Sequence, residues 1–508
     1  MFLIDGNNLN VQNSIKIIIE NLKIGISGKV ALRIRKSRAL VEKWTDEGEI
    51  VYGINTGFGE FKDIIISKEK IEKLQENLIL SHSAGVGDYI PDEIARLILL
   101  FRINSLIKGY SGVRLELIDF LIKYFNAGLV PQIPEKGSVG CSGDLAPLAH
   151  MAQTFLGYGY MKYKGKVYKS KTALAKAGLK PVILSSKEGL ALINGTQMMS
   201  AYLCKSISET IVICKIADIA GAMTVEATKS TSKAYDARIQ KIRPHKGQSD
   251  SAYNLRCLLK GSEILKSHED CGKVQDAYSI RCIPQVHGVA KDALNYCIKV
   301  LNTEINSVTD NPLIFPEDSE HLEGGNFHGE PLAVASDFLK IAVCELGSIS
   351  ERRINRLLDG SLSGLPRFLA KEGGINSGFM IAQYTAAAIA SENKVLAHPA
   401  SVDSIPTSAN QEDHNSMGSI AARKLYEVTW NVKTIIAIEL LCGAQALDFL
   451  RPLKAGPGVE KARELIRKEI KFSEKDEILS DMILKAKNAV FGLQFISKVE
   501  KITGGLKI

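Results

Sequence analysis

The sequence lacks the features that mark membrane-spanning and secreted proteins. No apolar run in its 508 residues reaches the roughly 18 residues that a transmembrane helix needs. The opening MFLIDGNNLNVQ has no cationic segment ahead of an apolar one, so we expect no signal peptide. The nine cysteines form no CxxC pair, and an odd, dispersed set favours reduced thiols. We therefore expect a cytoplasmic protein with no membrane partner.

The chain also lacks a strong excess of either charge. Its 64 basic and 56 acidic residues leave a net charge of +8, and there is no lysine block or basic tail. We therefore expect no nucleic-acid partner. A hydrophobic content of 45% and a charged content of 24% are typical of a globular protein with a substantial core.

Common nucleotide, metal and hydrolase motifs are missing as well. There is no GxxxxGK[ST] loop and no HExxH pair. Gly57-Phe58-Gly59 begins a dinucleotide-type loop but lacks the third glycine, and Gly140-Cys141-Ser142 begins a hydrolase elbow that ends in Asp144 instead of glycine. We expect neither a nucleotide cofactor nor a metal.

Hydrophobic periodicity predicts a mainly α fold. Pro91 and Asp92 open a segment whose apolar residues recur at helical spacing, and a short hairpin is expected around Lys164-Gly165. Long helical tracts apolar on several faces indicate a central bundle. These and other expected helices cover residues 67–80, 112–127, 197–229, 286–307, 331–358, 378–397 and 416–450. We predict a smaller N-terminal domain, 1–200, and a long-helix region, 201–508.

The stretch GSVGCSGDLAPLAH, residues 137–150, is the most informative part of the sequence. Three glycines and two serines surround Cys141, and a helix is expected to begin near Asp144 with Pro147 in its first turn. A tight loop that leads into a helix is one interpretation.

The tripeptide Cys141-Ser142-Gly143 also supports a chemistry that needs little beyond the backbone. The amide nitrogen of Gly143 can attack the carbonyl of Cys141, and loss of water closes a five-membered ring. A second dehydration removes the hydroxyl of Ser142 and leaves a methylidene, a strong electrophile. Glycine at 143 lets the backbone fold back, and the following helix dipole favours developing negative charge.

Seven further motifs accompany this tripeptide and cover nearly the whole chain. They are VYGINTGFG (51–59), NLILSHSAGVG (77–87), LINGTQ (192–197), VQDAYSIRCIPQVHG (274–288), TDNPLIF (309–315), GGNFHGEP (324–331) and SVDSIPTSANQEDHNSMG (401–418). With them the chain resembles the aromatic amino acid ammonia-lyases. The resemblance implies a 4-methylideneimidazol-5-one group formed from Cys141-Ser142-Gly143, and a homotetramer of long helices whose active sites are shared between subunits.

The resemblance also implies roles for individual residues. Tyr52 matches the base that takes the substrate β-proton, and its phenol needs a positive environment because its ordinary pKa is about 10. Arg281 matches the arginine that pairs with the substrate carboxylate. Tyr278 is expected near the electrophile and Gln275 beside the substrate. Asn194 is expected to bind the substrate and contact the prosthetic group.

His82 and Glu412 carry the expectation about the substrate. Ser81-His82 and the QEDH segment at 411–414 are similar to the histidine-specific branch of the family. A carboxylate at 412 can accept an imidazole N–H, and we also expect it to take part in catalysis; a histidine can donate or accept. The resemblance thus implies elimination of ammonia from L-histidine to give trans-urocanate, the first step of histidine degradation. Phe327 is expected to pack beside the substrate.

Two departures and several alternatives accompany this interpretation. Cys141 stands where the familiar tripeptide has alanine, and His287 stands where an apolar residue is expected. A tyrosine or phenylalanine ammonia-lyase, or an aminomutase of the same family, is the nearest alternative. An inactive helical scaffold is another, against which Ser142 and Gly143 argue. A fumarase-like lyase would need a GSSxMPxKxN loop, which is absent.

Overall fold

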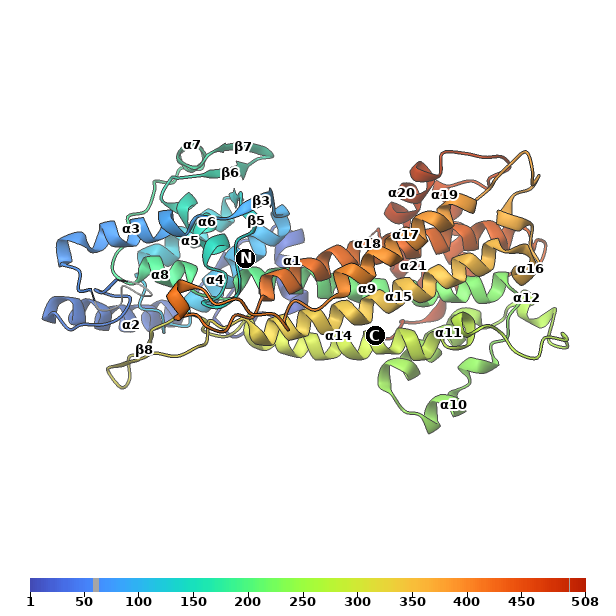
Figure 1. The fold of residues 1–508 in the computed structure, drawn as a ribbon, viewed down its shortest axis with the longest axis horizontal. Coiled ribbons are helices and arrows are strands. Elements are labelled where there is room, and N and C mark those ends of the chain that lie inside the picture. The colour runs from blue at the N-terminus through green and yellow to red at the C-terminus, as the bar shows by residue number, and fades with distance from the viewer. Residues whose placement is uncertain (58–63, 493) are drawn as a thin grey trace. The chain divides into compact units, whose positions relative to one another are not determined.

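The structure is a computed structural model that describes residues 1–57, 64–492 and 494–508. Helices predominate and the few strands are short, which confirms the mainly α prediction (Figure 1). Within the described residues, no helix combines the length and the apolar character that a membrane span requires. Phe58 and Gly59, which end the motif at 51–59, lie outside the described residues.

The chain divides into two compact units, each assembled from three segments. Unit 1 comprises residues 1–208, 298–337 and 399–423, and unit 2 comprises 209–297, 338–398 and 424–508. Four long helices contribute residues to both units: α9 (Gln197–Ala227), α14 (Ile283–Glu304), α15 (Glu330–Leu358) and α18 (Gly418–Asp448). The contiguous domains expected from the sequence stay a prediction.

In its described residues, unit 1 combines helices with four small sheets. Strands β1 and β2 pair in parallel, whereas β3 with β5, β4 with β6, β6 with β7, and β8 with β9 pair antiparallel. Its elements are β1 (Phe2–Leu3), α1 (Val11–Ile19), β2 (Ile24–Gly25), α2 (Gly28–Glu47), η2 (Lys68–Lys70), α3 (Ile71–His82), β3 (Val86–Tyr89), α4 (Asp92–Leu106), α5 (Leu115–Asn126), β4 (Val130–Pro131), β5 (Pro134–Lys136), α6 (Leu145–Phe155), β6 (Tyr160–Tyr163), β7 (Lys166–Lys169), α7 (Ser170–Lys176), α8 (Glu188–Ile193), β8 (Leu313–Phe315), β9 (Glu320–Leu322) and η5 (Ser408–Asn410).

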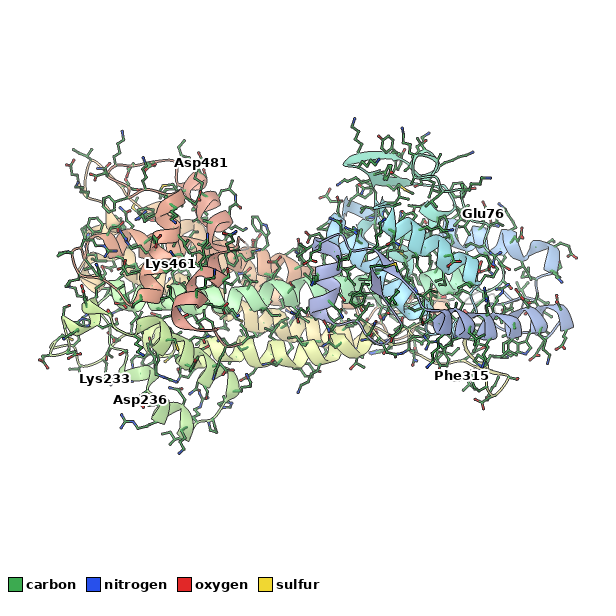
Figure 2. All side chains as sticks on the ribbon, turned by 180° about the vertical axis from the view of Figure 1, so that it is seen from behind. Glu76, Lys233, Asp236, Phe315, Lys461 and Asp481 are labelled. Atoms are coloured by element: carbon green, nitrogen blue, oxygen red, sulfur yellow. The ribbon has the colours of Figure 1, made fainter. Side chains whose placement is uncertain are left out.

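The described residues of unit 2 form helices and connecting segments but no strand. At the start of α10 the side chain of Asp236 accepts a hydrogen bond from the Arg238 backbone N–H and caps the helix (Figure 2). Besides its parts of the four long helices, its elements are η3 (Lys233–Tyr235), α10 (Ala237–Ile242), α11 (Lys246–Leu259), α12 (Glu263–Lys266), α13 (Tyr278–Arg281), α16 (Gly360–Ser363), η4 (Arg367–Leu369), α17 (Met380–Ala397), α19 (Pro457–Glu469), α20 (Leu479–Val490) and α21 (Phe495–Thr503).

Local sequence explains several of these elements. Pro91 precedes α4 at its N-cap, as predicted, and every residue from Leu97 to Leu106 is buried, so α4 forms a central part of the unit 1 core. The predicted hairpin joins β6 to β7 through Lys164 and Gly165. Their φ angles of 47° and 78° lie in the left-handed region, as a two-residue hairpin turn requires.

Helices α3, α6 and α8 pack against one another in unit 1, and predicted site residues lie at their ends. His82 is the last residue of α3, Asn194 is the C-cap of α8, and the loop with Ser142 runs directly into α6. Mutual packing of the three helices therefore brings three separate sequence motifs to one place.

Candidate active site

A large cavity of about 1240 Å³ lies within unit 1, where these helix ends meet. Its volume exceeds the few hundred Å³ of a typical small-molecule pocket. Six of the predicted site residues are among those that line it. They are Tyr52, His82, Ser142, Asn194, Phe327 and Glu412, and Cys141 of the predicted precursor lines it as well.

The loop ahead of Ser142 is fixed by residues just before and within the first turn of α18. The Ser416 hydroxyl donates to the Gly140 carbonyl at 2.8 Å, and the Met417 backbone N–H donates to the Val139 carbonyl at 2.8 Å. The Ser419 hydroxyl donates to the Ser138 carbonyl, also at 2.8 Å. These bonds join parts of the chain about 280 residues apart, and their effect is to hold the loop at the cavity wall.

Gly143 is pressed against Gly195. The two form an isolated parallel bridge, and the Asp144 N–H donates to the Gly195 carbonyl at 2.7 Å. A Cβ built on Gly143 would lie 2.2 Å from the Gly195 oxygen, and the φ of Gly143 is +73°. Only glycine fits here, for steric and conformational reasons.

Asn194 contacts the backbone carbonyl of Ser142. Its Nδ2 donates to the Ser142 carbonyl oxygen at 2.9 Å, while its Oδ1 is buried and has no hydrogen-bond partner among the residues that the structure describes. A buried polar atom without a partner is costly in a protein interior unless a ligand completes it. Asn194 thus has one side-chain atom engaged with the loop and one available to a bound molecule.

Glu412 is the centre of a dense hydrogen-bond cluster. Its Oε1 accepts from the Ser142 hydroxyl at 2.7 Å, and its Oε2 accepts from the Cys141 thiol at 3.1 Å and from the Thr407 hydroxyl at 2.8 Å. Burial raises the pKa of Glu412, but these three donors outweigh it and the pKa is lowered. The carboxylate is therefore ionised at neutral pH.

His82 shares the cavity with this carboxylate and is half-buried. Its Nδ1 lies 3.1 Å from the Ser81 hydroxyl. Burial lowers the pKa of His82, although the negative charge of Glu412 acts in the opposite direction. A neutral imidazole in this position has one nitrogen that donates and one that accepts.

Three predicted site residues lie elsewhere, in unit 2. Gln275, Tyr278 and Arg281 are not among the residues that line the cavity. They do come together, since Arg281 Nη1 donates to Gln275 Oε1 at 2.5 Å and the guanidinium lies 5.8 Å from the centre of the Tyr278 ring. Tyr278 is 74% exposed. The three side chains thus contact one another outside the cavity of this chain.

Sequence reasoning missed two buried groups that support the site. Asp144 was expected near a helix start, yet its Oδ2 accepts from the N–H groups of Met198 and Met199 in α9 rather than capping α6. Burial raises the pKa of Asp144 to about 7. The buried guanidinium of Arg102 donates to the Asn194 carbonyl at 2.7 Å. Neither role is visible in local spacing, because both partners are more than 50 residues away.

His287, one of the two departures, belongs to a separate buried ion network in unit 2. Its Nδ1 lies 2.7 Å from Asp218 Oδ1, and Lys291 Nζ donates to Asp218 Oδ2 at 2.8 Å. Arg353 lies 3.3 Å from the other His287 nitrogen and pairs with Glu439 at 2.6 Å. All five side chains are fully buried. His287 is thus a structural residue of unit 2 and not part of the cavity.

Among the described residues, one His/Glu group has ligand atoms within 4.8 Å of one another, namely His328, Glu330 and His414. His328 already has partners on both ring nitrogens, since Nε2 bonds the His414 carbonyl at 3.1 Å and Nδ1 accepts from the Glu330 N–H at 3.3 Å. We assign no metal to this group.

Comparison with known proteins defines the family. The family model for aromatic amino acid lyases matches residues 9–468. The chain belongs to the aromatic amino acid lyase family. A histidine ammonia-lyase of Caldanaerobacter subterraneus subsp. tengcongensis is 51% identical over 98% of this chain and 97% of that relative.

Members of this family with solved structures agree with the fold. The crystal structure of histidine ammonia-lyase from Trypanosoma cruzi is 45% identical and has a TM-score of 0.92 over 99% of this chain and 95% of its own. A tyrosine aminomutase from Streptomyces globisporus has a TM-score of 0.94 at 36% identity, with both chains fully covered. The aromatic lyase fold therefore hosts more than one reaction, and the residues around the cavity must decide between them.

Proposed function

We propose that this protein is a histidine ammonia-lyase, which eliminates ammonia from L-histidine to give trans-urocanate. The observation that carries the proposal is the meeting of Ser142, Glu412 and His82 in one cavity of a chain that is 51% identical to a histidine ammonia-lyase. Ser142 is a precursor of the electrophile expected in this family, and Glu412 and His82 can form hydrogen bonds with an imidazole ring.

The residues of the loop fit a 4-methylideneimidazol-5-one group made from Cys141-Ser142-Gly143. Gly143 has the left-handed φ and the absence of a side chain that its close approach demands, and Asn194 Nδ2 holds the carbonyl of Ser142. When present, this group supplies an electrophilic alkene that makes the substrate amine a better leaving group. The bond from Asn194 withdraws electron density from that carbonyl, which favours the electrophile.

Two polar groups that line the cavity, Glu412 and His82, select the substrate ring. Glu412, ionised and half-buried, can accept an imidazole N–H, and the neutral His82 can take or give a hydrogen bond according to its tautomer. A phenyl or phenol ring would leave one or both groups without a partner, at a cost of about 1–3 kcal/mol each. This cost separates L-histidine from the substrates of the aminomutases and other ammonia-lyases that share the fold.

Tyr52 is the proposed base for the β-proton of the substrate, and Phe327 packs beside the substrate. Both line the cavity and both are half-buried. A base must lie within hydrogen-bond reach of the proton that it removes, and position on the cavity wall meets that requirement. The carboxylate of Glu412 holds the ring and takes part in the proton movements around it.

A homotetramer with shared active sites is part of the proposal. Arg281 is suited to bind a substrate carboxylate, with Tyr278 and Gln275 beside it, and in this arrangement a second copy of the chain supplies all three. Unit 2 exposes large apolar side chains on α14, α15 and α17, as expected of helices that pack between subunits. They include Val289, Tyr296, Phe338, Ile341, Ile381, Tyr384 and Val395, each at least 46% exposed.

A cytoplasmic location also belongs to the proposal. None of the nine cysteines, all of which the structure describes, forms a disulfide, and reduced thiols are the rule in that compartment.

The test mixes the purified protein with L-histidine and follows urocanate by its ultraviolet absorbance. We expect turnover by the wild-type protein, none by Ser142→Ala, and an intact mass that is lower by two waters in the wild type alone. Cinnamate or coumarate formed from other amino acids, without urocanate, would overturn the histidine assignment. Equal turnover by Ser142→Ala would overturn the electrophile.

A further inference from the structure

The hydrogen bonds to Glu412 change when the prosthetic group forms. In the first condensation the Gly143 nitrogen bonds to the Cys141 carbonyl carbon, and the oxygen leaves as water with one hydrogen from each of the Gly143 and Ser142 nitrogens. In the second, the Ser142 hydroxyl leaves with the Ser142 Cα hydrogen as another water. No oxidant is needed. Glu412 Oε1 loses its donor in this step, because that donor is the departing Ser142 hydroxyl at 2.7 Å.

The other carboxylate oxygen keeps both of its donors. The Cys141 side chain takes no part in the condensation, so its thiol remains available to Oε2 at 3.1 Å, and the Thr407 hydroxyl remains at 2.8 Å. Thr407 and Glu412 are also joined through their backbones, since the N–H of Thr407 donates to the Glu412 carbonyl at 3.0 Å. Oε2 is therefore held from two directions while Oε1 is released into the cavity.

The Cys141 side chain is built to act as a donor and not as a nucleophile. It is only 5% exposed. Burial, followed by the charge of Glu412, raises the pKa of the thiol to about 12, so that it stays protonated in the working range of an enzyme. Alanine, the familiar residue at this place in the family, has no hydrogen to donate.

We infer that Cys141 is a positioning residue that, together with Thr407, fixes Oε2 of Glu412 and so presents Oε1 to the imidazole N–H of the substrate. The inference rests on the proposed function, because it needs both the condensation and an imidazole substrate. Cys141 acts through Glu412 and does not itself touch the substrate.

The first experiment compares Cys141→Ala and Cys141→Ser in the full-length enzyme, with Cys271→Ala, an exposed cysteine of unit 2, as the matched control. We expect Cys141→Ala to raise KM for L-histidine about threefold to tenfold, the range for loss of one ordinary hydrogen bond, because a thiol is a weak donor, with a smaller change in kcat. The acid limb of the kcat/KM profile moves to higher pH, because the ionised carboxylate loses a donor. Cys141→Ser restores both values, and Cys271→Ala changes neither.

The second experiment measures binding without turnover. Ser142→Ala lacks the hydroxyl that the second dehydration removes, so it cannot form the methylidene and reproduces the released Oε1 in an inactive protein. We expect 3-(imidazol-4-yl)propanoate to bind Ser142→Ala about threefold to tenfold more tightly than it binds the Cys141→Ala/Ser142→Ala double variant, as measured by calorimetry. Equal affinities would overturn the inference.

Intact mass separates the remaining outcomes. A Cys141→Ala protein that shows the two-water deficit and wild-type KM and pH profile overturns the positioning role alone. A Cys141→Ala protein without the deficit also overturns it, because Cys141 then acts in condensation. A wild-type protein without urocanate production or mass deficit overturns the proposed function instead.

Discussion

The cavity of unit 1 and the buried ion network of unit 2 use similar residues for opposite purposes. In the network, His287, Lys291 and Arg353 are each within 3.3 Å of a charged or polar partner, and every member is fully buried. In the cavity, Asn194 keeps a buried oxygen that has no hydrogen-bond partner among the described residues, and Glu412 is held partly by a hydroxyl that the proposed chemistry removes. The ion network is thus complete within the chain, whereas the cavity leaves polar groups that a ligand can pair with.

Two buried aspartates show the same contrast in their pKa values. Asp144 supports the cavity loop without a neighbouring cation, and burial raises its pKa to about 7. For Asp218 in the network, burial acts in the same direction, but Lys291 and His287 outweigh it and the pKa is lowered. Burial alone does not fix the charge of a carboxyl group, and for Asp218 the paired cations reverse the effect of burial.

The largest expected effect comes from a substitution that prevents formation of the electrophile but leaves the packing of the protein intact. We expect Ser142→Ala to lower kcat/KM for L-histidine by about a thousandfold or more, as removal of an essential group does. Its free energy of unfolding should stay within about 1 kcal/mol of the wild type, because a small side chain at the cavity wall is shortened. Urocanate absorbance and denaturant unfolding measure the two quantities. A large fall in the free energy of unfolding of Ser142→Ala would contradict this contrast, because the cavity would then be needed for stability as the ion network is.

The second change removes a positive charge from the buried ion network of unit 2. Lys291→Met leaves Asp218 buried with fewer donors, so we expect a loss of about 3–5 kcal/mol in the free energy of unfolding. The kcat of the protein that remains folded should be unchanged. Lys299→Met, an exposed lysine on the same helix α14, is the control and should change stability by about 0.5 kcal/mol at most. A reduced kcat in folded Lys291→Met would show that the network also serves catalysis.

A third change tests whether Glu412 recognises the substrate ring. Glu412→Gln keeps the shape but removes the charge, and we expect kcat/KM for L-histidine to fall about tenfold to a hundredfold, which corresponds to a loss of about 1.5–3 kcal/mol in transition-state stabilisation. Asp413→Asn, on the next residue of the same cavity wall, is the control and should change kcat/KM much less. If the two variants behave alike, a general change in cavity charge explains the effect better than ring recognition does.

A fourth change tests the pH dependence of stability. The carboxyl of Asp144 has an ordinary pKa of 3.8 and a folded pKa of about 7. Between these values the unfolded chain releases a proton that the folded chain retains, so this group makes unfolding more favourable as pH rises, by up to about 1.4 kcal/mol per pH unit. In Asp144→Asn this component is absent. The free energy of unfolding, measured from about pH 4 to 7, should therefore fall less steeply than in the wild type. An unchanged slope would contradict the raised pKa.

Local sequence patterns predicted the elements better than the contacts between them. The periodic tracts 197–229, 331–358 and 416–450 correspond to α9, α15 and α18 within a few residues, because periodicity is a property of neighbouring positions. The hairpin at Lys164-Gly165 was predictable for the same reason.

The cavity could be predicted only in part. The motifs indicated Glu412 and Ser142, but not the hydrogen bond between them across 270 positions, nor the part that Thr407 plays. The role of Arg102 beneath Asn194 carries no local signal, since an arginine within an apolar helix is compatible with many partners. Motif spacing also could not reveal that Arg281 lies outside the cavity of its own chain. Side-chain pairing depends on the completed packing, which no window of sequence contains.

The contact between Gly143 and Gly195 limits how this protein can be redesigned. A methyl group on Gly143 would meet the Gly195 backbone at 2.2 Å, and one on Gly195 would meet Arg102 Nη1 at 2.4 Å. Libraries that aim at a new substrate should therefore hold these two positions constant and vary His82 and Phe327, which line the cavity with side chains that can be exchanged.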